Sequence, residues 1–301
     1  MKYRNLSGGL ASVVISAVFL PALIAEMPAT TNTMSSPGKE NAGVGGELSA
    51  TDIEASIKRA MEFLVGKERS GGPQFSDYVV FCGQAVAAAS PEYQNVVDAY
   101  KIWITNNDKF IAQLPYQSVC HVMALDMIGQ REKAVDIFSS LTPLANEGKW
   151  LGIPYHNGWY LYGCLVAGDS EHLEKTFSHI SSDAEKSPNR YQYFTAYCLW
   201  KAYEKTKEDR YKQAFLTMAG NLKQFEKNHV EMAATDGHMG MTVAVLCQAY
   251  DLTKDEKYRE IARKLVEILL ATQEENGSWN DKTAYTIMPA EGLTSYLKFC
   301  R

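Results

Sequence analysis

Hydrophobic residues recur at helical spacing along most of the chain after Thr51. Between Tyr258 and Leu269, apolar side chains follow the i, i+3, i+4, i+7 spacing of a helix with one buried face. Gly, Pro, Asn and Asp separate such segments, and no convincing strand alternation appears. The pattern predicts an all-α chain of about twelve helices, at 52–67, 77–89, 92–106, 114–128, 130–141, 155–168, 169–182, 189–206, 209–227, 237–253, 255–272 and 286–300.

Two helix junctions are near copies of each other. The stretch AYEKTKEDRY at 202–211 matches AYDLTKDEKY at 249–258, and each holds a helix end, a polar turn and a new helix start. This repetition is typical of αα-hairpin repeats. Six hairpins whose first and last helices pair would close into an α/α toroid with parallel inner helices. An open solenoid is the alternative, but apolar helices at both ends of so short a chain favour closure.

The predicted inner helices share a feature at their starts. Five of the six begin beside a tyrosine, and these are Tyr78, Tyr116, Tyr155, Tyr191 and Tyr285. If the helices are parallel, these rings gather at one end of the toroid, where helix N-termini present free N–H groups and partial positive charge. The sequence therefore predicts an aromatic, polar funnel at that end.

The N-terminus has the pattern of an export signal. Lys2 and Arg4 precede an apolar stretch from Leu10 to Ala25, which is shorter than the roughly 20 residues that a membrane-spanning helix needs. We expect a signal peptide at 1–25, a flexible linker at 26–50 and the toroid domain at 51–301. The mature chain would then be periplasmic or secreted, without a stable membrane span. An uncleaved anchor is the alternative, because the small-residue pattern before residue 26 is imperfect.

Composition and charge limit the classes of partner that the chain is expected to bind. The chain is 46% hydrophobic and 22% charged, which is the balance of a globular protein. Its net charge is −5, and its 30 basic residues form no block, so nothing indicates nucleic-acid binding.

The segment Gln273–Trp279, QEENGSW, resembles the Gln-Trp repeat of terpenoid-cyclase and prenyltransferase toroids. The layout of 51–301 is also similar to the six-hairpin toroids of polysaccharide lyases and glycoside hydrolases. The Asp-x-Asp-Asp motif of the cyclases is absent, which argues against terpene cyclisation. The resemblance implies a polysaccharide lyase that cleaves uronate-containing glycan by β-elimination. A glycoside hydrolase and a non-catalytic toroid that binds glycan or protein are the alternatives, and a prenyl-type enzyme is a further one.

The segment 152–162 holds the richest set of candidate residues. His156 and Tyr160 are i, i+4 neighbours on a helix, so two proton carriers stand side by side. Tyr155 and Trp159 offer flat faces to a sugar ring, and Asn157 can neutralise a uronate carboxylate. The structural alternative is that Trp159 packs between helices and His156 caps one.

Further candidates lie at other inner-helix starts. His238 would project into the funnel behind Asp236, an N-cap candidate, and the adjacent glycines allow a ligand or a neighbouring helix to approach closely. Arg190 suits an anionic sugar, and the alternative is a solvent-exposed charge before a helix. The remaining substrate-binding candidates are Gln117, Tyr191 and Tyr193, while His121 reads more simply as a core histidine.

The hydrolase alternative depends on acidic residues, because glycoside hydrolysis needs a general acid and a second carboxylate that flank the glycosidic bond. Asp77, Asp236 and Glu291 fall near inner-helix starts, and Glu291 is expected to be half buried on the last inner helix.

The six cysteines fall one to each predicted inner helix: Cys82, Cys120, Cys164, Cys198, Cys247 and Cys300. The simplest interpretation is small packing residues near a crowded axis. Cys82 with the Cys120-His121 pair faintly resembles the zinc set of lanthionine-cyclase toroids, but that family's characteristic glycines are missing. We expect no metal and no cofactor.

Overall fold

The computed structural model describes residues 48–68, 76–106, 115–141, 145–146, 149–150, 156–186, 192–224 and 238–301. Within these residues the chain forms twelve α-helices, which confirms the all-α class and the expected number of helices. They are α1 (Ala50–Glu68), α2 (Ser76–Ala89), α3 (Gln94–Asn106), α5 (Pro115–Met127), α6 (Arg131–Leu141), α7 (His156–Ala167), α8 (Ser170–Lys186), α9 (Gln192–Thr206), α10 (Asp209–Gln224), α12 (His238–Thr253), α13 (Glu256–Thr272) and α14 (Thr283–Phe299).

Most helix boundaries lie within a few residues of those expected from the hydrophobic pattern. The sequence did not predict the short 3-10 helix η1 (Pro91–Tyr93) or the antiparallel pair β1 (Ala145–Asn146) and β2 (Lys149–Trp150). None of the described helices is both long and apolar enough to cross a membrane. The predicted signal peptide at 1–25, and the linker up to residue 47, lie outside the described residues.

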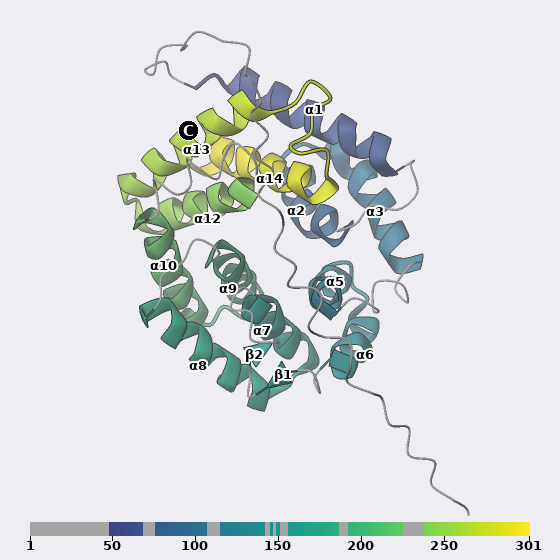
Figure 1. The fold of residues 1–301 in the computed structure, drawn as a ribbon, viewed down its shortest axis with the longest axis vertical. Helices are drawn as coiled ribbons and strands as arrows, with labels where there is room; N and C mark the ends of the chain where they lie inside the picture. The colour runs from purple at the N-terminus through teal and green to yellow at the C-terminus, as the bar shows by residue number, and fades with distance from the viewer. Residues whose placement is uncertain are drawn as a thin grey trace, which may run out of the picture. The chain divides into compact units, whose positions relative to one another are not determined.

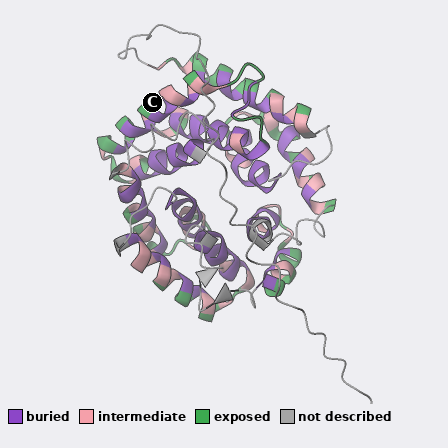
Figure 2. Cartoon of the chain, viewed as in Figure 1, coloured by how far each residue is buried: buried purple, intermediate pink, exposed green. Residues whose placement is uncertain are grey.

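The helices form two layers whose inner contacts run in a closed cycle (Figure 1). In the inner layer α2 contacts α5, α5 contacts α7, and the series continues through α9, α12 and α14 back to α2. Each inner helix also packs on an outer one, in the pairs α2–α3, α5–α6, α7–α8, α9–α10, α12–α13 and α14–α1. The inner helices are buried along most of their described length, whereas the outer helices keep an exposed face (Figure 2).

The two similar sequence segments fold into the same turn. Lys207 and Lys254 both adopt a left-handed backbone conformation, with φ of 61° and 56°. The Lys207 N–H donates to the Tyr203 carbonyl at 2.8 Å, and the Lys254 N–H donates to the Tyr250 carbonyl at 2.7 Å. The internal repeat therefore has a structural counterpart in two equivalent αα-turns.

The turn after α13 ties the last hairpin to the first helix. The Gln273 amide donates to the carbonyls of Ser56 on α1 and of Gly277, each at 2.9 Å, and accepts from the Ser56 hydroxyl at 2.8 Å. Trp279 donates its indole N–H to the Leu269 carbonyl at 3.0 Å. The segment with the Gln-Trp pattern thus fixes α1, α13 and the start of α14 together.

Helices α12 and α14 approach each other so closely that their contact requires glycine. A Cβ added at Gly240 would overlap the backbone of Met288 and Pro289, and one added at Gly292 would overlap the backbone of Gly240. The sequence predicts that either a ligand or a neighbouring helix comes close to the glycines next to His238. At Gly240 the close neighbour is helix α14.

We predict that Gly240→Ala destabilises the fold by about 3 kcal/mol, because the methyl group forces α12 away from α14. Thermal unfolding measures this as a fall of several degrees in Tm. Gly220→Ala on α10 is the matched control, since its Cβ would meet only the Tyr258 hydroxyl, at 3.8 Å. That substitution should leave Tm unchanged or raise it, because alanine favours a helix interior. Equal effects of the two substitutions would contradict the close helix contact.

Candidate functional site

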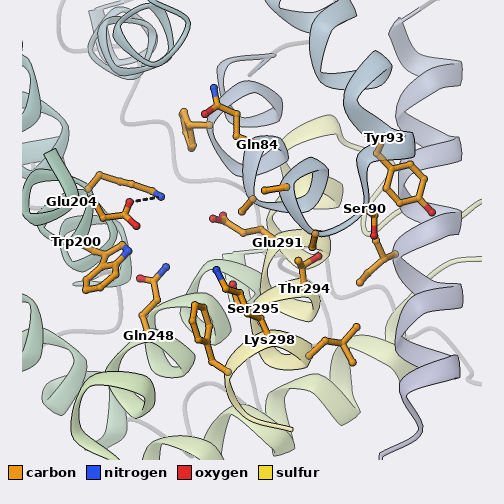
Figure 3. Close-up of a pocket in the computed structure, with 18 of the residues that line it drawn as sticks. Gln84, Ser90, Tyr93, Trp200, Glu204, Gln248, Glu291, Thr294, Ser295 and Lys298 are labelled. Atoms are coloured by element: carbon orange, nitrogen blue, oxygen red, sulfur yellow. Dashed lines mark hydrogen bonds and ion pairs between the residues drawn. The ribbon is translucent and has the colours of Figure 1, made fainter.

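A pocket of about 700 Å³ lies where the C-terminal parts of several inner helices meet (Figure 3). It is lined from α2, α5, α9, α12 and α14, with α1 and η1 completing one side. Its volume is in the range of small-ligand sites. Because the lining residues come from the late parts of these helices, the pocket lies at the opposite end from the predicted funnel.

Glu291 of α14 is the buried acid of this pocket, and its side chain points into the open space (Figure 3). The residue is 1% exposed. The Tyr197 hydroxyl donates to its Oε1 at 3.0 Å, and the Cys82 thiol also donates to the carboxylate. Its Oε2 is buried and has no hydrogen-bond partner among the described residues. One carboxylate oxygen is therefore held in place, while the other has an unused hydrogen-bonding capacity beside the pocket.

Burial raises the pKa of Glu291 to about 7, since the low-dielectric surroundings disfavour the charged carboxylate. The nearby Lys201 ammonium and the hydrogen bonds from Cys82 and Tyr197 lower this pKa, whereas the Glu204 carboxylate raises it. Near neutral pH the group is therefore partly protonated, and it can both give and take a proton.

The last turns of α9 supply the second polar group of the pocket. The Lys201 ammonium pairs with the Glu204 carboxylate at 2.8 Å. Trp200, which also lines the pocket, packs against Tyr203 and Phe215 with ring centroids 5.6 and 5.3 Å apart.

Two amide side chains complete the polar lining. Gln84 of α2 and Gln248 of α12 both line the pocket, and Gln248 Oε1 is buried without a hydrogen-bond partner in the described part of the chain. An aromatic face with amides and carboxylates around it is a surface on which a sugar ring can stack and form hydrogen bonds.

Glu291 is the sequence-predicted residue that the structure places in this pocket. Three others come together elsewhere, in the core. Tyr78 and Trp159 have ring centroids 5.9 Å apart, and Phe194 links them to Tyr193 through contacts of 5.9 Å to Trp159 and 4.5 Å to Tyr193. All of these rings are buried, so Trp159 packs between helices, which is the structural alternative expected for it. Of the five tyrosines predicted to line the funnel, Tyr78 belongs to this cluster.

Tyr160 faces the outer layer. Its ring centroid lies 5.1 Å from that of Phe138 on α6 and 6.5 Å from that of His172 on α8. The residue is fully buried, and it does not line the Glu291 pocket.

Two other predicted substrate-binding residues also lie apart from the pocket. Asn157 is buried near the start of α7, and the half-buried Tyr285 lies under the Lys282 ammonium, 4.9 Å from its ring centroid.

Several predicted site residues cannot be placed. Tyr155, Arg190, Tyr191 and Asp236 lie outside the described residues, as do the side chains of Tyr116, Gln117, His156 and His238. The funnel at the N-terminal ends of the inner helices, and the roles given to these residues, stay predictions.

His121 forms a buried pair with Asp77, with its Nδ1 2.7 Å from the Asp77 carboxylate. Cys120 lies 3.9 Å from the Tyr78 hydroxyl, whereas Cys82 contacts Glu291. In the part of the chain that the structure describes, no group of three or more His, Cys, Asp or Glu side chains could hold a metal ion. All six cysteines are buried as free thiols, in agreement with a packing role.

The sequence reasoning missed Trp200, Lys201, Glu204, Gln84 and Gln248. The signal was present, because Tyr197, Lys201 and Glu204 follow one helical stripe at i, i+4 and i+7 on a helix that is otherwise buried.

We predict that Glu291 makes the fold less stable as the pH rises from about 4.5 to about 7. Its pKa is raised in the folded chain, so over this range the unfolded chain loses the proton first, and its free energy falls relative to that of the folded chain. Replacing it by Gln removes this dependence. The free energy of unfolding of Glu291→Gln relative to the natural chain should therefore increase by about 3 kcal/mol between pH 4.5 and pH 8.

Urea denaturation at the two pH values measures this difference. Glu275→Gln, at an exposed position away from the pocket, is the control and should show the pH dependence of the natural chain. The same pH dependence in Glu291→Gln would show that Glu291 has an ordinary pKa.

No protein-family model, curated protein or solved structure matches this chain.

Proposed function

We propose that this chain is an exported carbohydrate-active enzyme of the α/α-toroid class that hydrolyses glycosidic bonds at Glu291. The observation that carries the proposal is a buried carboxylic acid whose pKa is raised to about 7 inside a pocket of ligand size. The export signal rests on the basic and apolar pattern of residues 1–25.

The toroid assignment is supported by three features of the described helices. The inner helices contact one another in a closed cycle, and each pairs with one outer helix. The Gln273 side chain joins the turn after α13 to α1, so the two ends of the helical series are fastened together. Six hairpins closed in this way are the arrangement that the internal repeat predicts.

The pocket contains the groups that hydrolysis requires. Protonated Glu291 donates its proton to the glycosidic oxygen as the bond to the anomeric carbon breaks. Glu204, paired with Lys201, is the second carboxylate, and it activates a water molecule or stabilises the positive charge that develops on the sugar. Trp200 provides a face for the sugar ring, while Gln84 and Gln248 bind its hydroxyl groups.

The charge of the pocket favours hydrolysis over the lyase reaction. A uronate carboxylate placed here would meet Glu204 and Glu291, and the Lys201 ammonium is already paired with Glu204. A lyase would instead use the end of the inner helices that holds His156 and His238. That reaction stays a prediction, as do the non-catalytic and the zinc or prenyl-type alternatives.

We predict that Glu291→Gln lowers kcat for glycan hydrolysis by about 10²- to 10⁴-fold, because the amide has no proton to donate. The purified chain is incubated with neutral, amino and uronate-containing polysaccharides, and new reducing ends are measured. Glu275→Gln, outside the pocket, should keep full activity.

The product distinguishes the alternatives. Ultraviolet absorbance of an unsaturated uronate would identify a lyase and contradict hydrolysis. Binding of a glycan without turnover would identify a non-catalytic toroid, and stoichiometric zinc in the purified protein would favour the metal enzyme.

We also predict that hydrolysis declines as the pH rises through about 7, because Glu291 then loses the proton that it must donate. Lys201→Met should move this decline to higher pH, since the Lys201 ammonium lowers the pKa of Glu291. The measurement is kcat/KM between pH 5 and 9 for both chains. An unchanged alkaline limb in Lys201→Met would contradict the assignment of the limb to Glu291.

A further inference from the structure

The wall of the Glu291 pocket carries more negative than positive charge. Four carboxylates line it from four different elements: Glu54 of α1, Glu92 of η1, Glu204 of α9 and Glu291 of α14. The two ammonium groups in the lining, Lys201 and Lys298, are both engaged. Lys201 pairs with Glu204 at 2.8 Å, and Lys298 lies 4.7 Å from the ring centroid of Phe299.

The helix ends at the pocket also carry partial negative charge. The last residues of α2, α5 and α14 all line it, namely Ala89, Met127 and Phe299. A helix C-terminus carries a partial negative charge from its unpaired carbonyls. The backbone therefore adds to the field of the four carboxylates.

The unsatisfied atoms of the pocket complement a ligand that is rich in hydrogen-bond donors. Glu291 Oε2 and Gln248 Oε1 are buried, and neither has a partner among the described residues. Gln248 Oε1 is an acceptor, as Glu291 Oε2 is when ionised. Hydroxyl and ammonium groups supply donors of the required kind, whereas a carboxylate does not.

The pocket extends to both sides of Glu291, from the last turns of α9 to the η1 region. In Figure 3, Trp200 and Glu204 lie on one side of Glu291, and Ser90 and Tyr93 of the η1 region lie on the other. Glu92 is adjacent to Tyr93 in the chain, and Glu54 comes from α1. Both are exposed, and neither forms an ion pair with any residue that the structure describes. An ammonium held on the η1 side would stay apart from the Lys201–Glu204 pair.

From these observations we propose that the pocket selects glycans with free amino groups, such as polymers of glucosamine, and that Glu54 and Glu92 bind the ammonium. The inference rests on the proposed glycan hydrolysis and names its substrate class. The Tyr93 ring, partly buried in the same wall, adds a face on which the cation can rest. Glu291 then acts on a glycosidic bond next to the amino sugar.

The test is calorimetric binding of glucosamine trimer and N-acetylglucosamine trimer to the full chain carrying Glu291→Gln, which prevents cleavage of the ligand. We expect the amino trimer to bind about tenfold more tightly at low salt, and this preference to diminish as ionic strength rises. Adding Glu54→Gln and Glu92→Gln should abolish the preference. Adding Glu275→Gln instead, which removes the same charge away from the pocket, should leave it intact.

Two results would overturn the inference: equal affinity for both trimers, or a preference that survives the loss of Glu54 and Glu92. Hydrolysis of N-acetylated or neutral glycan by the natural chain without such a preference would leave the proposed hydrolase standing. Conversely, a preference that depends on both carboxylates, without cleavage of either trimer, would support the ammonium site and contradict the hydrolase.

Discussion

The close packing of α14 against α12 is the constraint on which the site depends. Gly240 and Gly292 let the two backbones meet, and α1, α2 and α13 also contact α14. The middle of α14 is therefore covered by helices except toward the pocket, and Glu291, next to Gly292, is fixed where little water reaches its carboxylate. The energetic cost of burying this charge appears as the raised pKa, so the chemistry of the pocket follows directly from the packing of two helices.

The aromatic core forms one wall of the pocket through Phe81. Phe81 lines the pocket and also contacts Tyr78, Trp159 and Tyr197, with ring centroids 4.9, 5.2 and 6.0 Å apart. Tyr78, which lies near the start of α2, thus belongs to the packing of the inner layer. An apolar wall strengthens the electrostatic interactions of the polar groups beside it.

The sequence predicted the helices and the repeat well because both depend on local spacing. Glu291 was found for the same reason, as an acid on a helix expected to be apolar. The direction in which a side chain points from its helix depends instead on the other helices that pack against it, and these are distant in the sequence. Tyr160 stands one turn after His156, yet its ring lies against α6 and α8. The pocket itself needs the late parts of α2, α9, α12 and α14 to converge, which no single segment encodes.

The closed cycle of helix contacts has a consequence for how such a chain can change over evolution. A linear array of hairpins can gain or lose a unit at its end and keep every other interface. In the cycle each inner helix touches two inner neighbours, so deleting one hairpin breaks two interfaces and leaves two apolar faces without a partner. A change in the number of hairpins is therefore costly in this fold. We expect changes in the pocket to arise through substitutions and through loops of different length.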